Sequence, residues 1–454
     1  MPIIYEAARD AMSRHLTDVS KKKALEQGSE EELVTNSHQY QVDGELGRVT
    51  FTTHSVKKDQ TAIYSTAKSI FPDIGNSEWY KTIGFKEMAM IYGATEESYR
   101  KTADLINRIR YQEDKPTPMR TLKENTETEG TKVLDFVKQK TTEILKENDF
   151  TEEGTPKVKS EKYMKEPVLI PEKEVKEAIC ECNLSAEEVA EIEKNHVDYE
   201  SAKETVNISI DDVSTKKQKE ERGGKKKGDD ETGGREYVHN TVAHVQKEGK
   251  SYVINSCSTV NALRTIIGFL LNNDLLKYRL QFFVDGQKTL QAGILKAFSW
   301  FKNIGLILDW YHLEEKCKMQ LSMAMKGRDI RNDVLTTFMR LLWHGMVDKA
   351  IDYLRTLDDD LVRDRGKLKV LINYIERNRP YIPCYEVRKR LGLRNSSNIG
   401  EKMNDLVVSE RQKHNGMSWS WNGSVALTSM AVLKRNKEYK GWFEEGNLKL
   451  KLAA

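Results

Sequence analysis

Three acidic side chains, far apart in the sequence, are candidates for a site that holds divalent cations. Asp211 follows the run Ile-Ser-Ile and Asp285 follows the run Phe-Phe-Val, as when a buried strand delivers a carboxylate to the edge of a sheet. Glu401 comes after the loop-like segment Ser-Ser-Asn-Ile-Gly. Two aspartates on strands and a distant glutamate on a helix can hold two Mg²⁺ (or Mn²⁺) ions for phosphoryl transfer on nucleic acid. We therefore predict a two-metal site formed by these three residues.

Each acid also has a purely structural interpretation. An aspartate at the end of a strand often forms a turn or caps the next helix, and Asp285-Gly286 precedes an expected helix. Asp212 competes with Asp211 for the first position, since neighbouring strand residues point to opposite faces. We prefer Asp211 because it ends the apolar run. Glu401 by itself would be an ordinary acid on a helix surface.

A second acid at a strand end carries a histidine three positions later, in Asp309-Trp-Tyr-His312. This pair would commonly be a structural Asp–His pair within a core. Next to the three acids, we expect Asp309 and His312 to support the site, with His312 near the metals but not a direct ligand.

The bulk composition excludes several classes of protein. Of 454 residues, 31% are charged, the net charge is +3, and the mean hydropathy is −0.65. Without an apolar run of about 18–20 residues or a signal peptide, we expect no membrane partner and a cytoplasmic location. The five cysteines argue against a disulfide scaffold, and Cys180 and Cys182 have no second pair at zinc-binding spacing.

Basic residues are concentrated in three segments that we expect to contact DNA. The first, 81–110, has the pattern of a helix-turn-helix: a helix over 85–92, a break at Gly93, and a basic helix from Thr95 to Arg110. The others are 216–227 and the aromatic tail after Glu401. Helical packing and a solvated surface are the alternatives. The candidate DNA-binding residues are Arg100, Lys101, Arg108, Arg110, Lys216, Lys217, Lys219, Arg411 and Lys413.

The spacing of apolar residues predicts five regions. Region 1–125 is mostly α, with one hairpin in which Tyr40 and Val42 alternate before a turn and Val49 and Phe51 return. Region 126–204 is a helical linker, with a capping box at Ser185 and Glu188. Region 205–312 is predicted to be an α/β mixed sheet flanked by helices, the pattern is helical throughout 313–378, and the chain returns at Ser396 to a helix that holds Glu401. The expected strands are 206–210, 237–245, 251–256, 279–285 and 304–309, and helices are expected over 259–273 and 287–301.

Several motifs resemble one family over roughly residues 205–436. The motifs are Phe-Val-Asp-Gly-Gln-Lys-Thr-Leu (283–290), Leu-Ile-Leu-Asp-Trp-Tyr-His-Leu (306–313), Leu-Leu-Trp-His-Gly (341–345), the segment 388–401 and Gly-Met-Ser-Trp-Ser (416–420). They resemble the bacterial insertion-sequence transposases related to the Mutator superfamily. The resemblance implies a ribonuclease H-like α/β catalytic domain over 205–312 and 396–454, interrupted by an all-α insertion over 313–395. Its DDE triad would be Asp211, Asp285 and Glu401. Asp309 and His312 would match that family's Cys/Asp-x-x-His motif. Asp212 stands where the family usually has glycine, and the family's Cys-rich knuckles are missing upstream.

The resemblance implies a DNA transposase that binds terminal inverted repeats and catalyses cleavage and strand transfer. Its partners would be double-stranded DNA, at the element ends and the target site, and further copies of the chain in a homo-oligomer. The expected location is the nucleoid in a bacterial cytoplasm. Two alternatives stay open: a ribonuclease H-like nuclease without strand transfer, and a DNA-binding relative that has lost catalysis.

Overall fold

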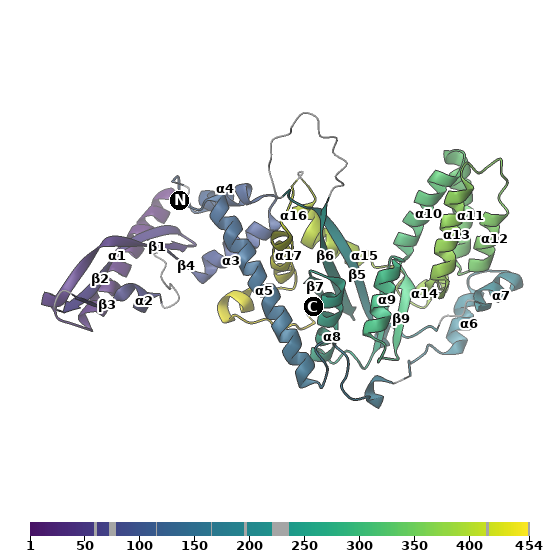
Figure 1. Ribbon diagram of the computed structural model, residues 1–454, viewed down its shortest axis with the longest axis horizontal. Helices are drawn as coiled ribbons and strands as arrows, with labels where there is room; N and C mark the ends of the chain where they lie inside the picture. The colour runs from purple at the N-terminus through teal and green to yellow at the C-terminus, as the bar shows by residue number, and fades with distance from the viewer. Residues whose placement is uncertain are drawn as a thin grey trace. The chain divides into compact units, whose positions relative to one another are not determined.

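The computed structural model describes residues 1–58, 61–71, 79–114, 116–164, 166–194, 198–219, 236–414 and 417–452 (Figure 1). The chain forms two compact units of mixed α/β structure. The first comprises 1–133, 413–417 and 426–449, and the second comprises 134–412, 418–425 and 450–454. The division therefore lies within a helix rather than at the predicted boundary after residue 125, and most of the C-terminal tail belongs to the first unit. No helix in the described ranges combines the length and apolar character needed to cross a bilayer.

A four-stranded sheet occupies the first part of unit 1, which is more than the single predicted hairpin. The hairpin itself is present as β1 (Leu33–Gly44) and β2 (Gly47–Lys58), with β3 (Thr61–Ser65) and β4 (Trp79–Lys81) at the edges in the order β3-β2-β1-β4. Leu16 of α1 (Pro2–Leu25) packs with Val42, Val49 and Phe51 in a small core, and α2 (Thr66–Ile70) follows β3. The region therefore contains more residues in helices than in strands, as predicted, but its strands form a full sheet.

The predicted helix pair of unit 1 is α3 (Ile83–Thr95) and α4 (Tyr99–Ile109). Gly93 lies inside α3, so the predicted break there is wrong. A Cβ at Gly93 would lie 2.6 Å from Thr126 Oγ1, which indicates that this glycine serves close packing. The turn comes later, where Ser98 caps α4 by accepting a hydrogen bond from the Lys101 N–H. Unit 1 is completed by parts of α5 (Met119–Glu147) and α17 (Trp421–Arg435) and by a π-helical turn, Gly441–Glu445.

A five-stranded sheet in the order β7-β6-β5-β8-β9 is the centre of unit 2. The strands β5 (Thr205–Lys216), β6 (Tyr237–Lys247) and β7 (Lys250–Ser256) form an antiparallel meander. The strands β8 (Arg279–Val284) and β9 (Ile304–Leu308) run parallel to β5 and follow α8 (Thr259–Asn272) and α9 (Lys288–Ala297). This is the predicted succession of three strands, helix, strand, helix, strand, although α9 is shorter than expected.

Helices follow β9 throughout the predicted insertion. They are α10 (Trp310–Ala324), α11 (Arg328–Trp343), α12 (Val347–Arg355), α13 (Arg365–Asn378) and α14 (Tyr385–Arg390), and Figure 1 shows α10 to α13 grouped together. Leu313, Leu321, Phe338, Leu342 and Ile375 are buried in their common core. The chain then enters α15 (Asn398–Asn404), a π-helical segment (Asp405–Ser409) and α16 (Glu410–Gln412).

Along the chain, two short helices come between α5 and β5. They are α6 (Glu172–Cys180) and α7 (Ala186–Lys194). The predicted capping box opens α7: the Ser185 N–H donates to Glu188 Oε2, and the Glu188 N–H donates to Ser185 Oγ. The predicted helical linker, 126–204, begins with the second half of the long helix α5 and continues through α6 and α7.

Candidate active site

Asp211, Asp285 and Glu401 line the same small hollow in unit 2. Asp211 lies on β5, Asp285 directly follows β8, and Glu401 lies in the first turn of α15. The parallel pairing of β5 with β8 extends to Ser209 and Phe283, so Asp211 and Asp285 lie two residues further on in the same register. The topology therefore brings together two acids separated by 74 positions and adds a third from a helix after the insertion.

Asp211 faces the hollow, and Asp212 does not. Asp211 Oδ1 accepts a hydrogen bond from the Asp212 N–H at 2.8 Å, and its Oδ2 accepts one from Asn404 Nδ2 at 3.0 Å. The exposed Asp212 carboxylate instead accepts hydrogen bonds from Thr241 Oγ1 at 2.5 Å and Thr259 Oγ1 at 3.4 Å. The alternation of the strand thus separates the two acids, and the geometry favours Asp211 as the member of the cluster.

The His312 ring contacts Glu401, with 3.0 Å between Nε2 and Oε1. Asp309 is buried and caps α10 through Oδ1, which accepts hydrogen bonds from the N–H groups of Tyr311 at 2.8 Å and His312 at 3.2 Å. Its Oδ2 accepts a hydrogen bond from the Ser397 N–H at the start of α15. One carboxylate therefore joins the helix that carries His312 to the helix that carries Glu401.

Gly400 allows α15 to approach β5 closely. A Cβ at this position would lie 2.1 Å from Ser209 Oγ and 2.9 Å from Ser209 Cβ. Any larger residue would push the helix, and Glu401 with it, away from Asp211. Sequence reasoning did not assign roles to Gly400, Asn404 or Ser209.

The insertion helix α13 holds the loop that carries Asp285. Tyr374 Oη donates to the carbonyl oxygen of Asp285 at 3.0 Å, and Arg377 Nη2 donates to that of Gly286 at 3.2 Å. Gly286 has φ +86°, and a Cβ there would lie 2.5 Å from Tyr374 Oη. Asp285 Oδ1 accepts a hydrogen bond from the Gln287 N–H at 2.8 Å. One oxygen of this carboxylate therefore forms a turn, which was the structural interpretation of Asp285 considered from the sequence.

Charge is crowded in this cluster. Burial and the nearby negative charges of Glu401 and Asp285 raise the pKa of Asp211 to about 6. Burial lowers the pKa of His312, but the hydrogen bond to Glu401 and the charges of Asp309, Glu401 and Asp211 outweigh it and raise the pKa to about 9. At neutral pH the cluster therefore holds more negative than positive charge, which a cation would relieve.

The donor chemistry fits a hard cation. Carboxylate oxygens are the ligands that Mg²⁺ and Mn²⁺ prefer. Within the described residues, the hydrogen bonds of Asp285 and Glu401 use one oxygen of each carboxylate, which leaves the second available to a ligand. Across the same residues, no three His, Cys, Asp or Glu side chains are already arranged as a metal-binding group. The residue types therefore fit Mg²⁺, while their spacing is not that of a formed coordination shell.

Most of the candidate DNA-binding residues lie at the surface. Six of them are exposed, namely Arg100, Lys101, Arg108, Lys216, Lys219 and Lys413. Lys101 forms an ion pair with Glu97, and the half-buried Lys217 forms one with Glu236 at 2.8 Å. Residues 220–227 of the predicted basic segment lie outside the described residues.

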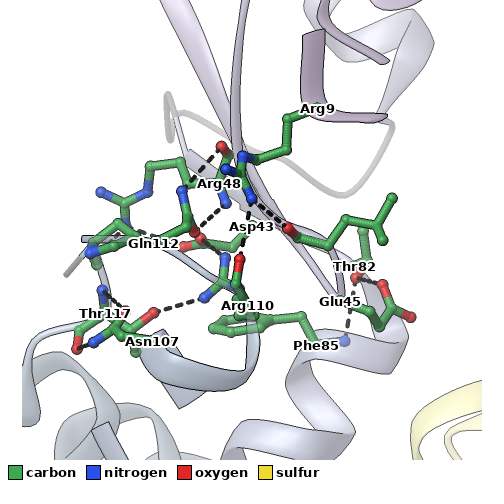
Figure 2. A network of polar contacts seen from close by, with 12 residues as sticks. Arg9, Asp43, Glu45, Arg48, Thr82, Phe85, Asn107, Arg110, Gln112 and Thr117 are labelled. Atoms are coloured by element: carbon green, nitrogen blue, oxygen red, sulfur yellow. Dashed lines mark hydrogen bonds and ion pairs between the residues drawn. The ribbon is translucent and has the colours of Figure 1, made fainter. Parts of the chain in front are cut away.

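Arg110 and Arg411 are buried, so their predicted contact with DNA is wrong. Arg110 is fully enclosed, and its Nη2 lies 2.7 Å from Asp43 Oδ1 (Figure 2). Its Nη1 donates to Thr117 Oγ1 at 2.9 Å, and its guanidinium lies 4.6 Å from the centroid of the Phe85 ring. Arg411 is 3% exposed and lies over the Trp419 ring at 5.0 Å. Both arginines therefore stabilise the interior.

Comparisons with known proteins add no family to this description. No family model matches the chain, and no curated protein is significantly similar to it. The functional assignment therefore depends on the site geometry and on the motifs that resemble the transposases.

Proposed function

We propose that this chain is a DNA transposase of the DDE type, which binds terminal inverted repeats and catalyses cleavage and strand transfer with Mg²⁺. The observation that supports it most strongly is the common hollow lined by Asp211, Asp285 and Glu401. Chance would seldom bring three acids from distant segments to one sheet edge, in the order that the resemblance implies. The crowded negative charge also has a direct use if cations bind there.

Each residue of the cluster has a distinct part in this proposal. Asp211, Asp285 and Glu401 would hold the ions, which when bound activate the attacking oxygen and neutralise charge on the leaving oxygen of the phosphodiester. Asn404 fixes the orientation of the Asp211 carboxylate. His312 holds Glu401, and Asp309 fixes the start of both helices. The nucleophile is water or a DNA 3′-hydroxyl, so no protein nucleophile is required.

The rest of the architecture is compatible with this function. A mixed sheet followed by an all-α insertion and a helix with the third acid fits a ribonuclease H-like catalytic domain. Double-stranded DNA, as element ends and target, is the proposed partner. The exposed basic side chains of α4 and of residues 216–219 would contact its phosphates. Holding two element ends together requires a homo-oligomer, and the proposed location is the nucleoid of a bacterial cytoplasm.

Cleavage of duplexes that carry the flanking inverted repeats tests the assignment. We expect cutting in Mg²⁺, none in EDTA, and a loss of at least about 100-fold in Asp285→Asn and Glu401→Gln, since each metal-holding acid contributes several kcal/mol to transition-state stabilisation. Asp212→Asn is the matched control, because the exposed Asp212 carboxylate lies outside the cluster, and it should cut normally. Normal cutting by Asp285→Asn would refute the triad.

A second assay separates the proposal from its nearest alternative. Pre-cut ends are mixed with target plasmid in Mg²⁺, and joined products are measured. A transposase yields joined DNA, whereas hydrolysis without joined product would favour the nuclease. A protein that binds the ends but neither cuts nor joins them would be the inactive relative.

A further inference from the structure

A cavity of about 730 Å³ lies beside the acid cluster, between α10, α13 and the loop after β8. It shares Asp285 and His312 with the hollow that holds the three acids. The remainder of its wall comes mainly from the helical insertion, so the insertion forms one side of the approach to the site.

Two cations on this wall have no carboxylate partner within the described residues. The ammonium of Lys316 lies 5.8 Å from the centroid of the Tyr374 ring, and the guanidinium of Arg377 lies 5.6 Å from the same ring. Arg377 donates through Nη2 to the carbonyl oxygen of Gly286, which leaves its other N–H groups for a ligand. Lys318 differs, since it forms an ion pair with Glu314 at 2.5 Å.

The same tyrosine ties these cations to the acid cluster. Tyr374 is 7% exposed, and its hydroxyl donates to the carbonyl oxygen of Asp285. The buried Tyr374 ring thus lies next to Lys316 and Arg377 and is hydrogen-bonded to the loop that carries Asp285. The two cations therefore lie close to the acid cluster.

The acids on the wall do not neutralise Lys316 and Arg377. Asp285 belongs to the cluster, and Glu315 accepts a hydrogen bond from Tyr311 Oη at 2.9 Å. An exposed methionine, Met319, adds apolar surface to the wall. A cavity with two cations, unused N–H donors and an apolar patch matches a polyanion that also has apolar parts.

We propose that Lys316 and Arg377 bind the phosphodiester backbone of the DNA strand that enters the acid cluster. The identification of the polyanion as DNA depends on the proposed function. An ammonium and a guanidinium are the side chains best suited to phosphate oxygens. The insertion thereby sets which phosphate reaches Asp285, Asp211 and Glu401, and Lys316 and Arg377 act as positioning residues.

The dependence of DNA affinity on salt tests this proposal without any catalysis. Affinity for a duplex is measured by fluorescence anisotropy in EDTA over a series of KCl concentrations. Each phosphate contact contributes about 0.9 to the slope of log affinity against log salt concentration. We expect the double variant Lys316→Gln/Arg377→Gln to lower the slope by about 2, and Arg377→Lys with Lys316 intact to retain most of it.

Lys369→Gln is the matched control. Lys369 is an exposed lysine of α13 that does not line the cavity. The slope of log affinity against log salt concentration for Lys369→Gln should therefore equal that of the wild type. A second measurement uses only the wild-type protein, so it tests the proposal even if a variant misfolds. Acetylation of lysines, read by mass spectrometry, should be slowed at Lys316 by bound DNA more than at Lys369.

The outcomes separate the two proposals. An unchanged slope in the double variant, or equal acetylation of Lys316 with and without DNA, overturns the phosphate-binding role. A wild type that binds no duplex overturns it as well. A lowered slope together with no cleavage under any divalent cation would keep the binding role and refute the transposase.

Discussion

At the scale of single residues, the acid cluster lowers the stability of the folded protein at neutral pH, because burial and the neighbouring acids disfavour the charge on Asp211. The folded state raises the pKa of Asp211 to about 6 from 3.8, so the folded protein binds this proton more tightly than the unfolded chain. Stability is therefore lost as pH rises from about 4 to 6. We expect Asp211→Asn to be more stable than the wild type at pH 8 without metal, by on the order of 1–3 kcal/mol.

Urea denaturation at several pH values checks this prediction. The difference between Asp211→Asn and the wild type should shrink below pH 4, where Asp211 is protonated in both states. Asp212→Asn, at an exposed position, should show little difference at either pH. A variant that is less stable at pH 8 than at pH 4, relative to the wild type, would contradict the charge crowding.

Gly400 is the residue on which the approach of α15 to β5 depends. We expect Gly400→Ala to lower the free energy of unfolding by about 1–3 kcal/mol, because its Cβ meets Ser209, and to abolish cleavage by displacing Glu401. Gly293→Ala on α9 is the control, since its Cβ would lie at an ordinary 3.7 Å from Leu263 Cδ1. Adding Ser209→Gly to Gly400→Ala should restore part of both losses.

At the scale of elements, Asp309 couples the starts of α10 and α15. Asp309→Asn keeps an acceptor oxygen for the N–H groups of Tyr311 and His312 but turns an amide toward the Ser397 N–H. We expect faster hydrogen exchange over 396–403 with little change over 310–316. Asp309→Ala should accelerate exchange in both segments, at a cost of about 1–3 kcal/mol.

Asp364 provides the matched control for this exchange experiment. It caps α13 by accepting hydrogen bonds from the N–H groups of Gly366 and Lys367, at 2.8 and 3.1 Å. Asp364→Ala should therefore affect the start of α13 and leave 396–403 unchanged. Unaltered exchange at 396–403 in Asp309→Asn would show that the Ser397 contact does not hold α15.

Local pattern predicted the elements well where apolar spacing decides the structure. The strands of unit 2, the helical insertion and the acids at the strand ends follow from alternation and helical periodicity. Features that depend on a partner distant in sequence were missed. Arg110 reads as a surface base until Asp43, 67 positions earlier, is placed beside it, and Gly93 reads as a break until Thr126 packs against it.

The first sheet was underestimated for a related reason. The hairpin was predicted from Tyr40 and Val42, but the first half of β1 was missed because polar residues such as Asn36 and Gln39 mask the alternation that marks a strand. Asn36 is satisfied by Thr53 and Ser55 of the neighbouring strand, at 2.9 and 3.0 Å. Such cross-strand pairs stabilise a sheet but leave no trace in the local hydrophobic pattern.

At the scale of the whole molecule, each unit is assembled from separate stretches of chain. Trp442 belongs to unit 1, where its Nε1 donates to Glu129 Oε1 at 3.0 Å. We expect Trp442→Ala to destabilise unit 1 by about 1–3 kcal/mol. Hydrogen exchange over 83–95 should rise, because the turn Gly441–Glu445 packs on α3, while exchange over 259–272 stays unchanged.

Trp421 is the control for this prediction. It is 45% exposed and belongs to unit 2, so Trp421→Ala should leave exchange over 83–95 as in the wild type. Equal protection of 83–95 in Trp442→Ala and the wild type would show that unit 1 is stable without the tail contact.

The return of residues 426–449 to the first unit also constrains how the protein is made. A ribosome releases the chain from its N-terminus, and many domains fold as soon as they emerge. Here the opening 133 residues share unit 1 with a segment synthesised near the end. The two segments pack closely at Gly130, where a Cβ would lie 2.1 Å from the carbonyl oxygen of Ala426. Nascent chains arrested before residue 426 should therefore expose unit 1 to proteases, and chains arrested far enough beyond residue 449 for it to leave the exit tunnel should protect it.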